Sequence, residues 1–113
     1  MIDFNTFRAL YAEAKNYDSE GKYIMERGWQ EWMNGLDDAD EIASMLRKIY
    51  RMANGGFSEI VSQYKNMKQM CNFFGIPYST AQKWSIEERN PSDYVLLLLA
   101  YATINIDKMH KSE

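Results

Sequence analysis

Apolar residues recur every three to four positions along most of this chain, which predicts amphipathic helices. The first predicted helix covers residues 3–15, and a loop over residues 16–21 separates it from a second helix over residues 22–34. The apolar face of the first helix carries Phe4, Phe7, Leu10, Tyr11 and Ala14. In the second helix Trp29 and Trp32 share one face, so we expect them to be buried between helices.

A third helix is predicted from the acidic cluster at residues 37–41 to the Asn54-Gly55-Gly56 break. Acids at a helix start complement the positive end of the helix dipole. The apolar stripe of this helix carries Ile42, Met45, Leu46, Ile49 and Met52 or Ala53. We take the break as the boundary between an N-terminal helical arm, residues 1–55, and a second domain, residues 56–107.

Four further helices are predicted over residues 57–63, 66–74, 78–86 and 91–105, and residues 108–113 are expected to form a flexible tail. The chain has only 6 Gly and 2 Pro, and no β-branched run, so its composition favours helices over strands. The predicted fold class is therefore all-α, with about seven helices. Apolar residues make up 46% of the chain, which is enough for a real core.

The candidate chemistry of the chain is sparse. The single cysteine, Cys71, excludes an internal disulfide and a cysteine-based zinc site, and a buried inert thiol is expected there. The only histidine, His110, lies in the predicted tail, and the cluster at 37–41 lacks the spacing of a calcium loop. No nucleophile–base pair can be assembled, so we expect no enzyme activity, cofactor or metal.

The chain opens on no basic-then-apolar segment, so no signal peptide is expected. The longest apolar run, residues 94–104, is too short to cross a bilayer, and no membrane association is expected. A cytoplasmic location is the resulting expectation.

The most informative stretch is residues 66–101, where two short predicted helices surround a tight turn and a third helix follows. This is the layout of a helix-turn-helix, a motif whose second helix inserts into the major groove of DNA. Gly75 would supply the left-handed backbone of the turn. Ala81 and Trp84 would face inward, and the outward set would be Tyr78, Ser79, Gln82 and Lys83.

Two segments carry a family resemblance, residues 74–84 with the sequence FGIPYSTAQKW and residues 89–94 with the sequence RNPSDY. They resemble the Cro/repressor-like helix-turn-helix family of the xenobiotic-response-element type. The match is to a small bacterial and mobile-element subgroup with an N-terminal helical arm. The resemblance covers about residues 57–101. It implies a lambda-repressor-like domain and a role as a transcriptional regulator that binds double-stranded DNA.

The resemblance places the helix over residues 78–86 in the major groove. Base contacts are then expected from Tyr78, Ser79 and Gln82, because a Gln amide can pair with adenine through two hydrogen bonds. Phosphate contacts are expected from Lys68, Thr80, Lys83 and Arg89. The alternatives are an ordinary polar helix face, a local capping role for Thr80 and a structural ion pair for Arg89.

Several residues depart from the family pattern. Ser79 stands where the family has Arg. The carboxylates of Glu87 and Glu88 would repel the phosphate backbone of DNA. The 13 Lys and Arg against 16 Asp and Glu give a net charge of −3, which argues against strong autonomous DNA binding. The alternative function is a protein-interaction module, or an acidic inhibitor or accessory protein of a mobile element, on the same scaffold.

One predicted helix segment is apolar on all sides and comprises Val95, Leu96, Leu97, Leu98 and Leu99. A helix at the edge of a small domain should expose a polar face to solvent. Either the N-terminal arm covers its second face, or a second copy of the chain does. The second possibility would give a homodimer with two-fold symmetric DNA half-sites.

Overall fold

The computed structural model describes residues 2–27, 39–86 and 89–111 of the chain. The described residues form seven helices and no strand, which confirms the predicted all-α class. In chain order the helices are α1 (Phe4–Ala14), α2 (Glu20–Arg27), α3 (Ala39–Gly55), α4 (Phe57–Val61), α5 (Met67–Phe74), α6 (Tyr78–Ser85) and α7 (Asp93–Lys111).

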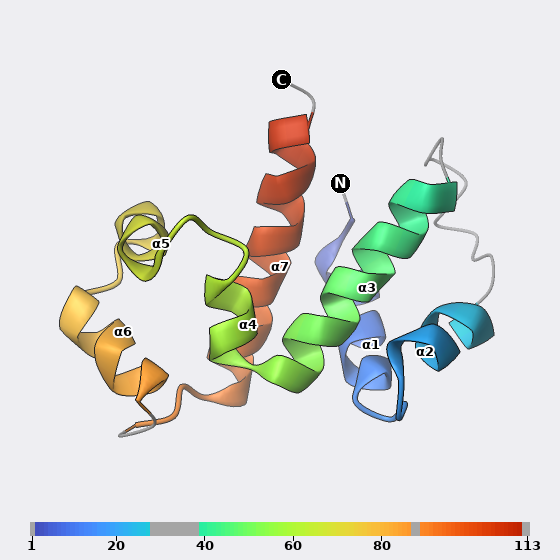
Figure 1. The fold of residues 1–113 in the computed structure, drawn as a ribbon, viewed down its shortest axis with the longest axis horizontal. Helices are drawn as coiled ribbons and strands as arrows, with labels where there is room; N and C mark the ends of the chain where they lie inside the picture. The colour runs from blue at the N-terminus through green and yellow to red at the C-terminus, as the bar shows by residue number, and fades with distance from the viewer. Residues whose placement is uncertain (1, 28–38, 87–88, 112–113) are drawn as a thin grey trace.

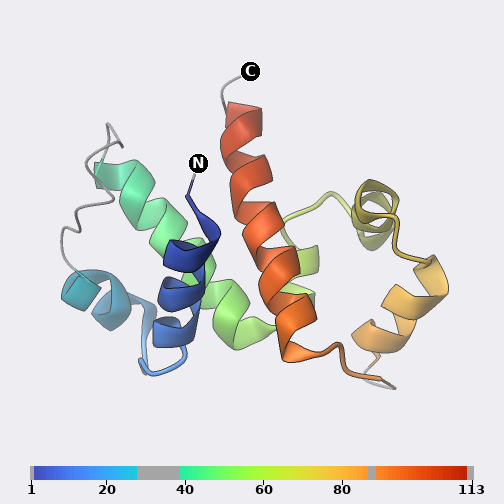
Figure 2. The same ribbon diagram turned by 180° about the vertical axis from the view of Figure 1, so that it is seen from behind.

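Helix α7 runs through the middle of the molecule (Figure 1). Helices α1, α2 and α3 lie on one side of it, and α4, α5 and α6 lie on the other (Figures 1 and 2). α1, α3 and α4 all contact α7, whereas α5 packs mainly on α6, and α6 reaches the body through α4. The α5–α6 pair therefore forms an outer edge of the molecule.

One hydrophobic core runs through both sides of the Gly56 break. It joins Phe7 and Leu10 of α1 and Ile49 of α3 to Ile60 of α4 and Met70 of α5. Gly56 itself has φ 72° and ψ −148°, a conformation essentially restricted to glycine, and the chain turns there directly from α3 into α4. The division into residues 1–55 and 56–107 stays a prediction, since both parts share this core.

The start of α2 differs from the expected start at residue 22. Ser19 caps the helix, because the backbone N–H of Lys22 donates to the Ser19 hydroxyl (3.2 Å) and that of Tyr23 donates to the Ser19 carbonyl (3.1 Å). Gly21, expected in the loop, therefore lies inside the helix. Arg47 and Arg51 of α3 then hold α2 through the Glu20 carboxylate, at 2.6 and 2.9 Å.

The N-terminal segment is tied to α7 by aromatic side chains. The Tyr101 ring contacts the rings of Phe4 and Phe7, with centroids 5.2 and 5.4 Å apart, and its hydroxyl donates to the Ile2 carbonyl (3.0 Å). The expected apolar face of α1 is confirmed, with Phe7, Leu10, Tyr11 and Ala14 buried.

The leucine-rich segment of α7 is covered unevenly. Leu99 is buried and Val95, Leu96 and Leu97 are half-buried, while Leu98 is 51% exposed. Helices α1 and α3 of the arm contact α7, and so does α4. Coverage of the leucine-rich segment by the arm stays a prediction. Burial by a second copy stays a prediction for the exposed remainder.

Helix α7 also extends to Lys111, beyond the expected end near residue 105. Thr103, Ile104 and Asn105 are all buried, so the helix is still packed on the body where the sequence led us to expect its end. The Thr103 hydroxyl donates to the Leu99 carbonyl (2.7 Å), so its side chain is bonded within α7 itself.

Some sequence expectations fall on parts of the chain outside the described residues. These are the burial of Trp29 and Trp32, the acids at 37 and 38, the pair Glu87 and Glu88, and the side chain of His110. None of the helices in the described ranges combines the length and apolar character that a membrane span needs.

Candidate nucleic-acid interface

The start of α5 is fixed by two side-chain hydrogen bonds. The backbone N–H of Gln69 donates to the Asn66 side-chain oxygen (2.8 Å), as the sequence pattern predicts for an N-cap. The Gln69 side chain in turn accepts from the backbone N–H of Lys65 (2.7 Å), one residue before the position of a standard capping box.

Gly75 makes the turn between α5 and α6. It adopts φ 74° and ψ 25°, the left-handed conformation that the sequence predicts for it. Its N–H and that of Ile76 both donate to the Cys71 carbonyl, at 2.8 and 3.0 Å, which closes α5. Pro77 then begins α6, and its carbonyl accepts from the N–H groups of Thr80 (3.0 Å) and Ala81 (3.2 Å).

The inward side of the α5–α6 pair anchors it to the rest of the protein. Met70, Cys71 and Ala81 are buried, and burial raises the pKa of the Cys71 thiol, so the thiol stays protonated at neutral pH. The half-buried Trp84 ring meets the Phe57 ring of α4 edge-on, with centroids 5.3 Å apart. The inward positions predicted for α6 are therefore found there.

The outward side of α6 gathers part of the predicted site. Ser79, Gln82 and Lys83 are exposed and line one shallow hollow of about 420 Å³ together with Met67, Ser85 and Ile86. Tyr78 is 46% exposed and Thr80 is half-buried, and neither is among the residues lining the hollow. Three of the seven predicted DNA contacts thus share one surface on the outward side of α6.

Two apolar members of this hollow were missed at the sequence level. Ile86 is 70% exposed and lies four positions after Gln82, directly beyond the end of α6. Residues four positions apart lie on the same face of a helix, so the outward position of Gln82 could have predicted that Ile86 is also exposed on this side. Met67 comes from the first turn of α5, and only the tertiary packing of α5 on α6 brings it there.

The two remaining predicted phosphate contacts flank α6. Lys68 is exposed in the first turn of α5, and Arg89 is exposed after α6. The Arg89 backbone N–H donates to the Lys83 carbonyl (3.3 Å), so the backbone of Arg89 lies beside that of Lys83. A structural ion pair for Arg89 stays a prediction.

The backbone at the start of α6 adds a weak positive field. Pro77 provides no side-chain cap, and no acid occupies the first turn. Uncapped N–H groups at the positive end of a helix dipole attract anions such as phosphate. In the described part of the chain, no three His, Cys, Asp or Glu side chains come close enough together to hold a metal ion.

Comparison with protein-family models, with curated proteins and with solved structures finds no match for this chain.

Proposed function

We propose that this protein is a non-enzymatic helix-turn-helix regulator that binds double-stranded DNA through α6. The observation that carries the proposal is the shared exposed face of Ser79, Gln82 and Lys83, on a helix held from behind by Ala81 and Trp84. The resemblance of residues 74–84 to Cro/repressor-like proteins supports the same assignment. The cytoplasm is the proposed location.

The dimensions of α6 suit a major groove. An α-helix with its side chains is about 10–12 Å across, which fits the width of about 12 Å of that groove. Helix α6 also lies at the outer edge of the molecule, away from α1 and α2 (Figure 1). We propose that Tyr78, Ser79 and Gln82 approach base edges.

The expected strength of binding follows from the number of cations beside α6. Lys68, Lys83 and Arg89 would neutralise about three phosphates per protomer, which gives a slope of about −2.7 in log affinity against log salt. Affinity for random duplex DNA should therefore fall about 40-fold between 50 and 200 mM salt. This is a modest electrostatic contribution, consistent with the net charge of −3.

A salt titration of binding to random duplex DNA, followed by fluorescence anisotropy, tests this proposal. Lys83→Gln should lower the slope by about one phosphate contact, whereas Lys22→Gln, at an exposed lysine of α2, should leave it unchanged. Absence of binding at very low salt, or equal effects of the two substitutions, would contradict the proposal.

The second candidate function is a protein-interaction module, including an acidic inhibitor or accessory protein of a mobile element. It is favoured by three exposed apolar side chains in the α5–α6 unit and directly after it: Phe73 (59% exposed), Tyr78 (46%) and Ile86 (70%). Aromatic side chains are common anchors in protein interfaces. A chain that binds no DNA at any salt concentration would support this candidate.

A homodimer is part of the first proposal, since helix-turn-helix proteins commonly bind two-fold symmetric half-sites. Tyr94 and Leu98 lie one turn apart on α7 and are 67% and 51% exposed. We propose this face as the contact between two copies.

A further inference from the structure

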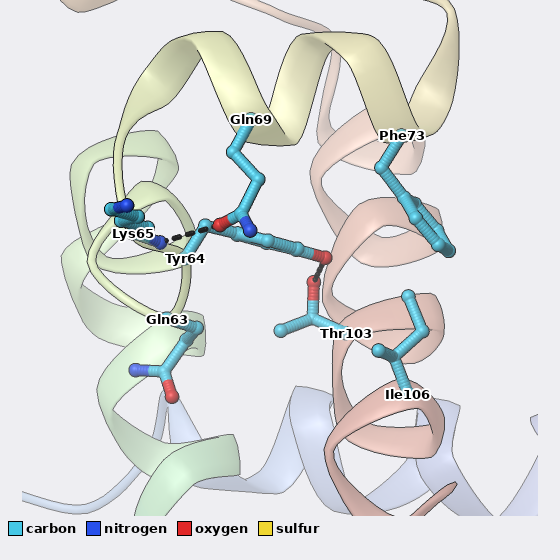
Figure 3. Close-up of a pocket in the computed structure, with 7 residues that line it drawn as sticks. All are labelled: Gln63, Tyr64, Lys65, Gln69, Phe73, Thr103 and Ile106. Carbon is cyan, nitrogen blue, oxygen red and sulfur yellow. Dashed lines mark hydrogen bonds between the residues drawn. The ribbon is translucent and has the colours of Figure 1, made fainter. Parts of the chain in front are cut away.

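A separate pocket of about 270 Å³ lies between α5 and α7 (Figure 3). Gln69 and Phe73 of α5 line one side, and Thr103 and Ile106 of α7 line the other. Residues 63–65, in the segment that connects α4 to α5, complete the described lining. None of these residues belongs to the hollow on α6, so the pocket is distinct from the candidate DNA surface.

Gln69 is exposed and lines the pocket, and among the described residues no side-chain or backbone acceptor is bonded to its Nε2 group. The Gln69 Oε1 atom accepts from the Lys65 backbone N–H (2.7 Å), and this contact fixes the orientation of the amide. The Nε2 group therefore lies on the other side, facing the Tyr64–Thr103 pair (Figure 3). Two N–H donors of Gln69 are thus available to a ligand that supplies an acceptor.

The hydroxyl groups in the pocket are already ordered. Thr103 donates its hydroxyl proton to the Leu99 carbonyl (2.7 Å), so the 2.8 Å bond between Thr103 Oγ1 and Tyr64 Oη takes its proton from Tyr64. Burial also raises the pKa of Tyr64, which keeps the phenol protonated. Neither hydroxyl has a proton left for a ligand, so Gln69 is the better donor.

The apolar part of the pocket is formed by Phe73 and Ile106, which point toward each other across it (Figure 3). The Phe73 ring is 59% exposed and Ile106 is half-buried, so apolar surface on both remains to be covered. An apolar cavity of about 150 Å³ is large enough for benzene. A pocket of 270 Å³ therefore has room for one ring and a polar substituent.

We propose that this pocket binds a small single-ring aromatic molecule with a carbonyl oxygen on the ring substituent, either an amide or an acid. The ring would lie between Phe73 and Ile106, and the oxygen would accept from Gln69 Nε2. Lys65 is the only charged side chain among the described residues that line the pocket, and it is compatible with either substituent. The site is independent of the proposed DNA binding.

The test is a titration of the full chain with benzamide and with benzoate, followed by two-dimensional NMR of the backbone amides. For ligands of this size we expect dissociation constants of about 1 mM. Shift changes should concentrate at Gln69, Phe73, Thr103 and Ile106. Binding of both probes identifies the carbonyl as the shared requirement, and binding of one alone assigns the site to amides or to acids.

Two variants with a matched control complete the test. Gln69→Glu keeps an acceptor for the Lys65 N–H but removes the donor, so it should abolish benzoate binding and weaken benzamide binding about tenfold. Phe73→Ala should weaken both probes about tenfold. Asn72→Asp makes the same amide-to-acid change on an exposed position of α5 and should leave binding unchanged.

No shift changes with either probe at concentrations well above the expected dissociation constant would overturn the proposal. So would unchanged binding by a Gln69→Glu protein, or shift changes confined to α6. A thermal melt of each variant, monitored by circular dichroism, establishes that the protein is folded before the titrations are compared.

Discussion

Among single residues, Gly75 sets the direction in which α6 leaves the end of α5. Its φ of 74° lies in the left-handed region, where an L side chain is strained. A Cβ atom added at Gly75 would meet no atom within 4 Å, so the strain would come from the backbone alone. Gly21 has equally open surroundings but lies inside a helix without a positive φ.

Substitution of these two glycines should therefore change stability in opposite directions. Gly75→Ala should lower the free energy of unfolding by about 1–2 kcal/mol, because alanine must adopt the left-handed conformation. Gly21→Ala should raise it by up to about 1 kcal/mol, since alanine loses less backbone entropy in a helix. Urea unfolding measures both. Equal effects of the two changes would contradict the role assigned to the turn.

Gln82 is the residue for which a base contact is best motivated, since its side chain is exposed in the middle of the outward face of α6. With a site selected from a random DNA pool, Gln82→Ala should cost about 1–3 kcal/mol of binding free energy, and little on unrelated sequences. The control is Asn5→Ala, at an exposed amide of α1. Equal losses on all DNA sequences would show that Gln82 reads no base.

At the scale of elements, the sequence identified the helices better than their ends. The core stripe of α3 is confirmed at Ile42, Leu46, Ile49 and Met52. α2 starts earlier than expected because Ser19 caps it, and α7 ends later because Thr103 and Ile104 are still buried against the body. Helix ends depend on single hydrogen bonds and on tertiary contacts, whereas helix faces follow from spacing over many residues.

The exposed face of α7 with Tyr94 and Leu98 is the proposed contact between two copies of the chain. If two copies meet through its exposed face, Leu98→Glu should abolish self-association, because each dimer would bury two charges without partners. Met25→Glu is the matched control, since Met25 of α2 is 82% exposed and lies outside this face. Sedimentation equilibrium over a range of protein concentrations measures the effect. A wild-type chain that stays monomeric throughout would remove the dimer from the proposal.

At the scale of the whole molecule, one core holds several ionisable groups in their protonated form. Burial raises the pKa of Tyr11, with a further contribution from Asp93, and burial raises the pKa of Tyr64 and Cys71. The Tyr23 pKa is raised most strongly, mainly by burial, and its hydroxyl donates to the Leu10 carbonyl (2.9 Å). The folded protein therefore holds these protons more tightly than the unfolded chain does.

Stability should therefore decline at alkaline pH. The contribution of a group with a raised pKa is complete below its unfolded value, about 8.5 for Cys and 10 for Tyr, and is lost as the pH rises through the folded value. The contribution of these groups to the free energy of unfolding should be constant up to about pH 8 and fall above it, first through Cys71 and then, beyond about pH 10, through the tyrosines. Urea unfolding at a series of pH values measures this decline.

Tyr23→Phe tests the largest of these contributions. It should cost about 0.5–1.5 kcal/mol at neutral pH through loss of the hydrogen bond to Leu10, and it should make the decline above pH 10 shallower. Tyr94→Phe, at a ring that is 67% exposed, should change the neutral-pH stability by less than about 0.5 kcal/mol. An identical alkaline decline in wild type and Tyr23→Phe would contradict the burial argument.

The sequence by itself determined the features that depend on residues a few positions apart. These include the Asn66 cap, the left-handed Gly75 and the outward positions of Ser79, Gln82 and Lys83 on α6. Each follows from helical spacing or from one residue's backbone preference, so no distant contact is needed to predict it.

Only the tertiary structure decided which helices meet. Tyr101 packs on Phe4 and Phe7 almost a full chain length away, and Phe73 faces Ile106 across a pocket that no spacing in the sequence indicates. An apolar stripe tells which side of a helix is buried, but not which partner buries it. That choice depends on how all the stripes fit together at close packing, which is a property of the whole chain.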